Sequence, residues 1–287
     1  MNTNLFTVTP MNHNVNLNPG EVYTGVIKVT NPADATTNFK YKIEVSPYGV
    51  TEDGSTANFS NETAYTQIVK WITVDEPEGE VEPNNTKEVK FTITVPENAP
   101  GGGQYAAIMV GSNNDSEAGE NLNVQNVFEM ASLVYAEING EIHQDAKIEQ
   151  NNIPGFVTGA PITLEASFVN NGNIHEQALV MISAKDVFTG RVIVSSENES
   201  DYYTELIMPE STRHVERNIN EGLPLLGIVH VEQSISYGGE FSKEEKNVII
   251  CPIWFMALVA VTIGAIIFTI VQIVGRHRKK AAKLAGW

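Results

Sequence analysis

One uninterrupted apolar run near the C-terminus constrains this chain more than any other feature. Ile249–Val274 contains no charged residue, and only Thr262, Thr269 and Gln272 are clearly polar. About 20 apolar residues in a helix cross the ~30 Å hydrocarbon layer of a bilayer, and this run is longer. It lacks the polar stripe of a helix packed on a soluble core, and it lies far from the N-terminal position of a signal sequence. We therefore expect one transmembrane helix over residues 248–275.

The charges on either side of this run predict its orientation. Five basic residues and no acidic residue follow it, in the tail 276–287, whereas the charges of the preceding segment FSKEEKN cancel. Lys and Arg beside a membrane helix stay on the cytoplasmic side. The pattern predicts a single-pass cell-membrane protein with its ectodomain outside and its C-terminal tail in the cytoplasm. A tail-anchored protein with a cytosolic head is the alternative, and it would oppose the basic tail.

The first residues do not form an export signal. The segment MNTNLFTVTPMNH has neither a basic start nor an apolar core. Because an ectodomain ahead of the helix needs such a signal, we expect that the sequence is a mature or truncated form, or that translation begins further upstream.

The ectodomain is strongly acidic. All 35 acidic residues precede the helix together with 13 of the 18 basic residues, so this part has a formal charge of −22 and the tail has +5. Such a charge repels nucleic acid and anionic lipid, which excludes both as partners of the ectodomain. Contact with the lipid bilayer is expected through Ile249–Val274.

Cys251 is the only cysteine, so no disulfide can form within the chain. Core packing must then stabilise the exported part, which argues against a disulfide-rich secreted scaffold. Cys251 lies at the outer edge of the apolar run. We expect it to be an ordinary apolar residue, and acylation is the alternative.

Apolar and polar residues alternate along much of the ectodomain. Tyr41, Ile43 and Val45 alternate with Lys and Glu, and the same pattern occurs in Val89–Val95 and Ile162–Phe168. This period is typical of antiparallel sheets with one buried face. Turn sequences such as NPG, EDGS and NNGN separate the runs, and no amphipathic helix of 12 or more residues is evident. The expected fold is an all-β ectodomain of two tandem Ig-like antiparallel β-sandwiches, followed by one transmembrane α-helix.

The chain divides into a first domain at 1–145 and a second at 146–247, joined by a short linker, with Asn151–Gly155 near the boundary. Two polar stretches, Thr51–Ala64 and Asn113–Asn123, are expected to be exposed loops. The first domain is expected to contain strands at Leu5–Thr9, Val22–Asn31, Asn38–Ser46, Gln67–Val74, Val89–Val95, Gln104–Gly111 and Val127–Asn139. The second is expected to contain strands at Ala146–Gln150, Ile162–Asn170, Ala178–Asp186, Arg191–Ser195, Glu205–Met208, Arg213–Asn220, Gly227–Tyr237 and Glu240–Lys246.

No residues have the spacing of a familiar catalytic or metal site. The histidines form no HExxH motif, there is no GxSxG motif, and the only cysteine lies next to the membrane run. We therefore expect no enzymatic activity, no cofactor and no metal, and the sequence assigns no ligand-binding residue. The histidines are His13, His143, His175, His214, His230 and His277.

Two local patterns resemble ligand loops only superficially. The run GGGQY at Gly101–Tyr105 lacks the lysine and the following helix of a phosphate loop, so its glycines are expected to permit a sharp start of a strand or a bulge. Asp115, Glu117 and Glu120 lack the spacing of a calcium loop. A solvated acidic loop is the expected interpretation.

His175 and Trp71 have a structural and a functional interpretation. His175 is expected at the start of a strand, where it helps to fix the turn, with ligand binding as the alternative. Trp71 is expected to be a core aromatic, and stacking on a sugar from an exposed position is the alternative. Glycosylation sequons, relevant only if the cell glycosylates its exports, include those at Asn58, Asn61, Asn84 and Asn198.

Several segments, taken in order, resemble a known family. The first part contains FTVTP, NLNPGEVYTGVIKVTNPAD, FKYKIEVSPYG, KWITVDEP and KFTITVPENAPGGGQYAAIMVGS, and the second contains LEASFVNNGNIHEQALVMISAKDVFTG, LIMPESTR and a strand ending in YGG. They resemble the WxL-interacting surface proteins of Gram-positive-type bacteria, which have two Ig-like domains, one transmembrane helix and a basic tail. The resemblance implies a cell-surface adaptor whose first domain binds peptidoglycan and whose second binds other proteins, including host ligands and WxL-domain proteins. It supplies no residue-level ligand motif.

The leading hypothesis is a non-catalytic, membrane-anchored cell-surface adaptor or adhesion protein. Its expected partners are cell-wall polymer, other surface proteins, or both. The alternative is a structural stalk or subunit of an envelope assembly, with Ala260 and Gly264 as a small-residue pair for helix packing. A hydrolase or sugar-processing enzyme would require an unrecognised carboxylate pair on the loops.

Overall fold

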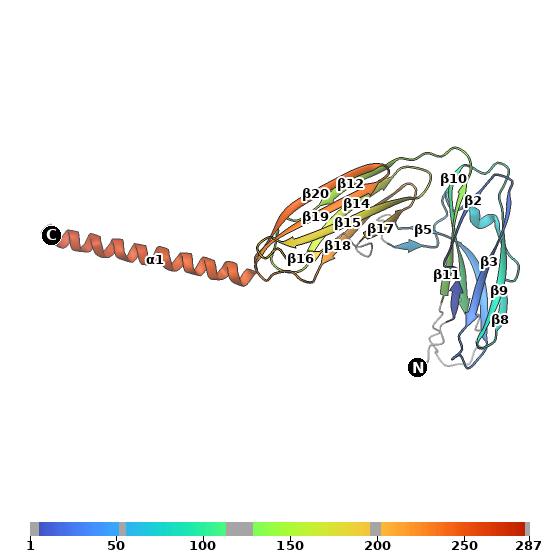
Figure 1. The fold of residues 1–287 in the computed structure, drawn as a ribbon, viewed down its shortest axis with the longest axis horizontal. Coiled ribbons are helices and arrows are strands. Elements are labelled where there is room, and N and C mark those ends of the chain that lie inside the picture. Colours follow the sequence, from blue (N-terminus) through green and yellow to red (C-terminus); the bar gives the residue numbers. More distant parts are fainter. Residues whose placement is uncertain (1–5, 52–55, 113–128, 196–201, 285–287) are drawn as a thin grey trace.

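The chain folds into two β-sandwiches followed by one long C-terminal helix, as Figure 1 shows. This computed structural model describes residues 6–51, 56–112, 129–195 and 202–284, with side chains up to residue 277. The two tandem Ig-like sandwiches expected from the alternating sequence are confirmed. The sandwiches meet at an angle, and the helix projects from the end of the second sandwich that lies away from the first (Figure 1).

The first sandwich packs a four-stranded sheet, ordered β1-β3-β9-β7, against a five-stranded sheet, ordered β2-β11-β10-β4-β8. All neighbours are antiparallel except β2 and β11, which are parallel. The four-stranded sheet contains β1 (Thr7–Thr9), β3 (Val22–Asn31), β9 (Asn85–Thr94) and β7 (Ile72–Val74). The five-stranded sheet contains β2 (Asn12–Leu17), β11 (Glu129–Ile138), β10 (Gly102–Ser112), β4 (Phe39–Pro47) and β8 (Glu78–Val81). The connection from β4 to β7 holds the short hairpin of β5 (Gly49–Val50) and β6 (Ala57–Asn58) and the 3-10 helix η1 (Gln67–Lys70).

The second sandwich packs a three-stranded sheet, ordered β12-β14-β18, against a larger sheet, ordered β13-β20-β19-β15-β16, in which β17 also pairs with β15. In its core the rings of Phe168 and Tyr237 meet edge to face at 5.3 Å. The smaller sheet contains β12 (Ala146–Asn152), β14 (Ile162–Asn170) and β18 (Ser211–Ile219). The larger sheet contains β13 (Phe156–Val157), β20 (Glu240–Ile250), β19 (Gly227–Tyr237), β15 (Glu176–Asp186), β16 (Val192–Val194) and β17 (Tyr202–Ile207).

The alternating sequence explains why these strands form two cores. In β9 the side chains of Val89, Phe91 and Ile93 are buried, while Lys90 between them is exposed. Each buried apolar side chain of this size stabilises the fold by roughly 1.5–3 kcal/mol relative to an exposed one. Strands up to Ile138 pair among themselves, as do strands from Ala146 onward. The domain limits 1–145 and 146–247 stay predictions, because strand pairing places the change only between Ile138 and Ala146.

The C-terminal helix α1 runs from Ile253 to Leu284. Its stretch Ile253–His277 is long and apolar enough to cross a membrane, and no part of its most apolar window is buried against the rest of the described chain. The predicted start near residue 248 was wrong, because Ile249 and Ile250 extend β20 and pair with β13 and β19. Pro252 then begins the helix by accepting hydrogen bonds from the backbone of the first turn. The helix also continues past residue 275 into the basic tail.

Two further predictions were wrong. Gln67–Val74 is not one strand, because η1 occupies its first half and only Ile72–Val74 is extended. The buried side chain of Gln104 stabilises this bend by bonding the Ile68 N–H at 3.2 Å and the Ala64 carbonyl at 2.8 Å. Asn151–Gly155, predicted at the domain boundary, lies within the second sandwich, where Asn151 pairs with Ala166. The predicted loop Asn113–Asn123 lies outside the described residues.

Candidate binding site between the two sandwiches

The two sandwiches contact each other at the glycine-rich start of β10. The Gly103 N–H donates to the Asn173 carbonyl at 2.7 Å, and the Asn173 side-chain amide donates to the carbonyls of Gly101 (3.1 Å) and Glu141 (2.8 Å). Gly102 has φ +121°, and a Cβ there would lie 2.7 Å from the Asn173 carbonyl oxygen. The glycines therefore lie at the start of a strand, as expected, and their lack of a side chain also allows the backbone of the other sandwich to approach closely.

A buried asparagine builds the turn that makes this contact. The side-chain amide of Asn170 donates to the carbonyls of Ile174 (2.8 Å) and Ile207 (3.1 Å), and its Oδ1 accepts from the Gly172 N–H at 2.9 Å. Side-chain bonds of this kind replace the backbone pairing that a tight turn gives up. The NNGN turn thus presents Asn173 and His175 to the first sandwich in a defined position.

Four aromatic side chains, which we call the aromatic cluster, meet at this contact: Tyr48, Tyr105, Tyr135 and His175. The Tyr105 hydroxyl accepts from the His175 backbone N–H at 2.8 Å and lies 3.1 Å from His175 Nδ1. The centroid of the Tyr135 ring is 5.6 Å from that of Tyr48, 5.9 Å from that of Tyr105 and 5.5 Å from that of His175. The cluster therefore joins the outer face of the five-stranded sheet, opposite the core side chains of Ala106 and Val134, to a turn of the second sandwich.

Burial favours the uncharged forms of His175, Tyr105 and Tyr135. It lowers the pKa of His175 below its ordinary value of 6.5, and it raises the pKa of Tyr105 and of Tyr135. The Tyr105 hydroxyl therefore keeps its proton and lies 3.1 Å from Nδ1 of a neutral His175. The same hydroxyl accepts from the His175 backbone N–H, so it makes both of these contacts to one residue of the other sandwich.

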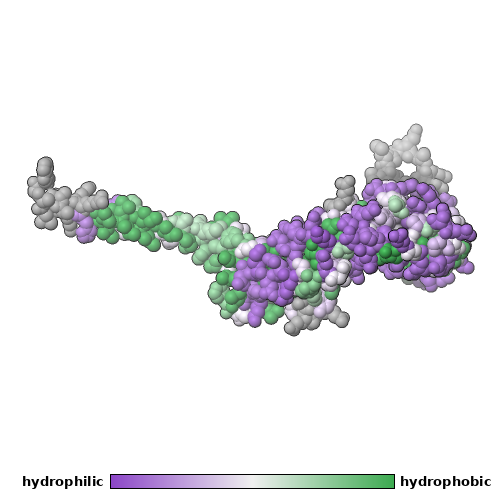
Figure 2. All heavy atoms as spheres, turned by 90° about the horizontal axis from the view of Figure 1, so that it is seen from above, coloured by the Kyte–Doolittle hydropathy of each residue, from purple (hydrophilic) through white to green (hydrophobic). Residues whose placement is uncertain are grey.

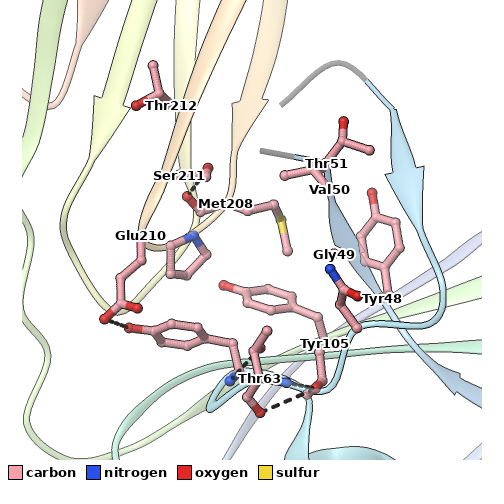
Figure 3. Close-up of a pocket in the computed structure, with 14 residues that line it drawn as sticks. Tyr48, Gly49, Val50, Thr51, Thr63, Tyr105, Met208, Glu210, Ser211 and Thr212 are labelled. Carbon is pink, nitrogen blue, oxygen red and sulfur yellow. Dashed lines mark hydrogen bonds between the residues drawn. The ribbon is translucent and has the colours of Figure 1, made fainter. Parts of the chain in front are cut away.

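A cleft of about 360 Å³ opens beside the aromatic cluster (Figure 3). The segments Tyr48–Thr51 and Thr63–Thr66 of the first sandwich line one wall, and Met208–Thr212, the turn after β17 with the start of β18, lines the other. The Tyr65 hydroxyl donates to Glu210 Oε1 at 2.9 Å and so links the two walls. Burial, with this hydrogen bond adding to it, raises the pKa of Tyr65 to about 12. We call this space the hydroxyl cleft, because tyrosine, threonine and serine hydroxyls surround it.

A second cleft, of about 400 Å³, is lined by the other members of the aromatic cluster. Tyr135 and His175 line it together with the side chains of Asn12 and Asn14 on β2 and of Gln177 on β15. We call it the amide cleft. The two clefts share the aromatic cluster, because Tyr48 and Tyr105 line the first and Tyr135 and His175 line the second.

This arrangement is suited to binding polar ligands. Aromatic faces beside amide and hydroxyl groups match molecules that combine apolar faces with many hydrogen-bonding groups, such as saccharides or extended peptides. Among the described residues, no group of three or more His, Cys, Asp or Glu side chains is placed to hold a metal ion.

The structure places the other residues considered from the sequence away from the clefts or at their edge. Trp71 is partly buried and packs on the core of the first sandwich, as the core interpretation predicted. His143 contacts the domain junction through its backbone, where its N–H donates to Asn173 Oδ1 at 2.8 Å. The sequon residue Asn61 lines the hydroxyl cleft. The residues that fall outside the described part are Asp115, Glu117, Glu120 and Asn198.

Sequence reasoning missed the residues that the fold brings together here. Tyr48, Tyr135 and Glu210 come from distant parts of the chain and carry no motif. The GGGQY run carried a weak signal, because a strand by itself does not require consecutive glycines. These glycines indicated a close contact at this segment, but they did not indicate that Asn173 makes it.

Comparison with known proteins identifies no family and gives only distant structural similarities. No protein-family model and no curated protein matches the sequence. A solved chaperone–tip adhesin complex of CFA/I fimbriae biogenesis is 11% identical, with 84% of this chain and 98% of that chain covered and a TM-score of 0.41. The class 5 fimbriae chaperone CfaA is 12% identical over 84% and 99% of the two chains, with a TM-score of 0.41. The E. coli chaperone DraB is 14% identical over 85% and 96%, with a TM-score of 0.37. These similarities are too distant to assign a function or a family to this chain.

Proposed function

We propose that this chain is a membrane-anchored cell-surface adaptor that binds cell-wall polymer or partner surface proteins without catalysing a reaction. Helix α1 supports the anchor, because its apolar stretch Ile253–His277 contacts nothing that would otherwise bury it in the described chain. The basic tail supports an orientation with both sandwiches outside the cell. The resemblance to WxL-interacting proteins points to the same kind of adaptor.

The observation that carries the binding proposal is the pair of clefts built by both sandwiches around one aromatic cluster. The hydroxyl cleft offers the ring of the half-buried Tyr48 beside hydroxyl groups, with the buried Tyr105 beneath it, and Tyr48, Tyr105 and Met208 border a common space in Figure 3. The amide cleft adds Asn12, Asn14 and Gln177. Amides and hydroxyls both donate and accept hydrogen bonds, as the hydroxyl and acetamido groups of peptidoglycan glycans require. A glycan strand is therefore the ligand that we favour for these clefts.

Co-sedimentation with purified peptidoglycan tests this proposal. The full-length protein, in phosphatidylcholine nanodiscs, should bind, and Tyr48→Ala should weaken binding about tenfold, which corresponds to ~1.4 kcal/mol. Tyr202→Ala is the matched control, because Tyr202 is exposed on β17 and lines neither cleft. A parallel pull-down of envelope proteins with the same variants tests whether the ligand is a partner surface protein instead. Retention on neither material, or an equal effect of both substitutions, would contradict the proposal.

A structural stalk is the second candidate. The main-chain contacts of Gly103 and Asn173 favour it, since they hold the two sandwiches in one arrangement, and β20 leads into α1 with only two residues between them. Replacing α1 by an unrelated membrane helix separates the candidates. A stalk that assembles through Ala260 and Gly264 should lose its function. An adaptor that works through the clefts should keep it.

A further inference from the structure

The end of the second sandwich from which α1 emerges exposes large apolar side chains on loops and on the ends of strands. Leu225 is 84% exposed and Phe188 is 75% exposed, so both lie almost wholly in solvent. We call this surface the apolar collar and define it by Phe156, Phe188, Leu225, Leu226 and Ile249, all of which are exposed. Large apolar side chains gathered at one end of a domain mark an interaction surface.

Strand pairing shows that the collar residues converge at one end of the sheet. Ile249, on the last strand, pairs with Phe156 and with Ile228, which lies two residues after Leu226. The Val187 N–H donates to the Ile228 carbonyl at 3.0 Å, which places the turn carrying Phe188 beside the same strand end. Helix α1 begins three residues after β20 ends, a distance of at most roughly 10 Å. In Figure 2 the hydrophobic surface of α1 continues onto the adjoining end of the second sandwich.

The turn that carries Phe188 has a fixed shape. Asp186 Oδ1 accepts from the N–H groups of Phe188 and Thr189, each at 2.9 Å, and the Gly190 N–H donates to the Asp186 carbonyl at 2.9 Å. The Arg191 guanidinium donates to the Gly222 carbonyl and so joins this turn to the loop that carries Leu225. Hydrogen bonds therefore hold the two loops that carry Phe188 and Leu225 in place.

The collar differs in charge from the rest of the ectodomain. The segments that form it, 155–158, 187–192, 221–228 and 249–252, contain one basic residue, Arg191, and one acidic residue, Glu221. The acidic residues that give the ectodomain its formal charge of −22 therefore lie almost entirely outside the collar. Exclusion of lipid on the ground of overall acidity does not extend to this end, where apolar burial rather than charge attraction would provide the binding energy.

We propose that the apolar collar inserts into the outer interface of the bilayer that α1 crosses, so that the second sandwich sits directly on the membrane. This inference rests on the proposed membrane crossing by α1. The occupant is lipid because the collar is continuous with the exposed apolar side chains of Ile253 and Trp254, and an aromatic ring such as that of Trp254 favours the interface. The collar would set the orientation of the ectodomain and the height of both clefts above the membrane.

Lipid-depth quenching of single-cysteine variants tests the inference. The full-length protein with Cys251→Ser, one copy per phosphatidylcholine nanodisc, is labelled with an environment-sensitive fluorophore at L225C or at F188C, which lie on separate loops. V22C, at an exposed site of the first sandwich, is the aqueous control, and I266C reports the centre of α1. Quenching by spin-labelled lipids should be at least threefold stronger at L225C and F188C than at V22C, with blue-shifted emission.

The outcomes separate this inference from the proposed function. Strong quenching at I266C with L225C and F188C equal to V22C would overturn the collar proposal and leave the membrane anchor intact. Absence of lipid quenching at I266C would overturn the anchor itself, and with it the collar. A blue shift at L225C without lipid quenching would show burial against protein, which also contradicts the collar proposal.

Discussion

Tyr105→Phe should weaken the docking of the two sandwiches. Tyr105 is fully buried, and its hydroxyl is the acceptor of the His175 backbone N–H at 2.8 Å and a partner of His175 Nδ1 at 3.1 Å. Phenylalanine keeps the ring and its packing and removes only the hydroxyl. The docked state then contains an N–H group without its acceptor, whereas the undocked state exposes that N–H to water.

The size of the effect follows from this unmatched donor. Leaving one buried polar group unsatisfied costs about 1–3 kcal/mol. A difference of 1–3 kcal/mol corresponds to about a 5–150-fold change in an equilibrium constant. The substitution should therefore raise the population of the undocked state by that factor.

Hydrogen exchange at the Gly103 amide provides the assay. This N–H donates to the Asn173 carbonyl across the domain junction, so its exchange requires the sandwiches to separate. Tyr105→Phe should accelerate its exchange about 5–150-fold, by the same equilibrium argument. The bond itself is untouched by the substitution, so the change reports docking.

Tyr41→Phe is the matched control. Tyr41 is also fully buried in the first sandwich, but its hydroxyl has no hydrogen-bond partner among the described residues. Removing an unpaired buried hydroxyl should leave stability unchanged or raise it. Unchanged Gly103 exchange in Tyr105→Phe, or equal acceleration in both variants, would refute the reasoning.

Three further predictions concern charge, pH and backbone geometry. Glu205 forms ion pairs with Arg213 and Arg217, so Glu205→Ala should lower the free energy of unfolding by about 2–3 kcal/mol in urea titrations. This is less than the roughly 3–5 kcal/mol expected for breaking a fully buried pair, because both arginines are partly solvated. Glu245→Ala, which breaks an exposed pair, should change the free energy of unfolding little. Burial lowers the pKa of His175, with the charge of Glu137 opposing this, so docking should be strongest above pH 6.5 and weaken as the pH falls toward the lowered value. The exchange rate of the Gly103 amide, taken relative to its intrinsic rate at the same pH, should therefore be higher at pH 5.5 than at pH 7.5. His175→Gln should remove this dependence except for the share of His13, whose pKa burial also lowers. Gly102→Ala should raise Gly103 exchange by more than tenfold, since φ +121° costs an alanine about 1–3 kcal/mol before the contact with Asn173 is counted, and an unchanged rate would contradict this.

The sequence predicts the central strands well because burial on one face imposes the alternation. Val22–Asn31, Ile162–Asn170 and Gly227–Tyr237 have the predicted bounds. The edge strand β2 was not predicted, because its asparagines and histidine interrupt the apolar pattern and it pairs with β11 alone. Edge strands depend less on their own burial, and so their sequences indicate them less clearly.

Hydropathy could not separate the last strand from the helix. Ile249 and Ile250 are as apolar as the residues of α1, and only their pairing with Phe156 and with β19 shows that they are extended. Single-sequence patterns describe local preference, and here the neighbouring strands decide the conformation.

The clefts could not be predicted for a different reason. The position of His175 at the start of a strand was expected from GNIHE, but its contact with Tyr105 depends on how the two sandwiches dock. Tyr48, Tyr135 and Glu210 become neighbours only through that docking. Sequence spacing indicates nothing about such a tertiary arrangement.

Labelling intact cells with a membrane-impermeant maleimide tests the central claim most directly. In the Cys251→Ser background, one cysteine replaces Val22 of the first sandwich or Ala282 of the tail. If α1 crosses the membrane with both sandwiches outside, V22C reacts in intact cells and A282C reacts only after permeabilisation. Protection of V22C together with labelling of A282C in intact cells would contradict the account.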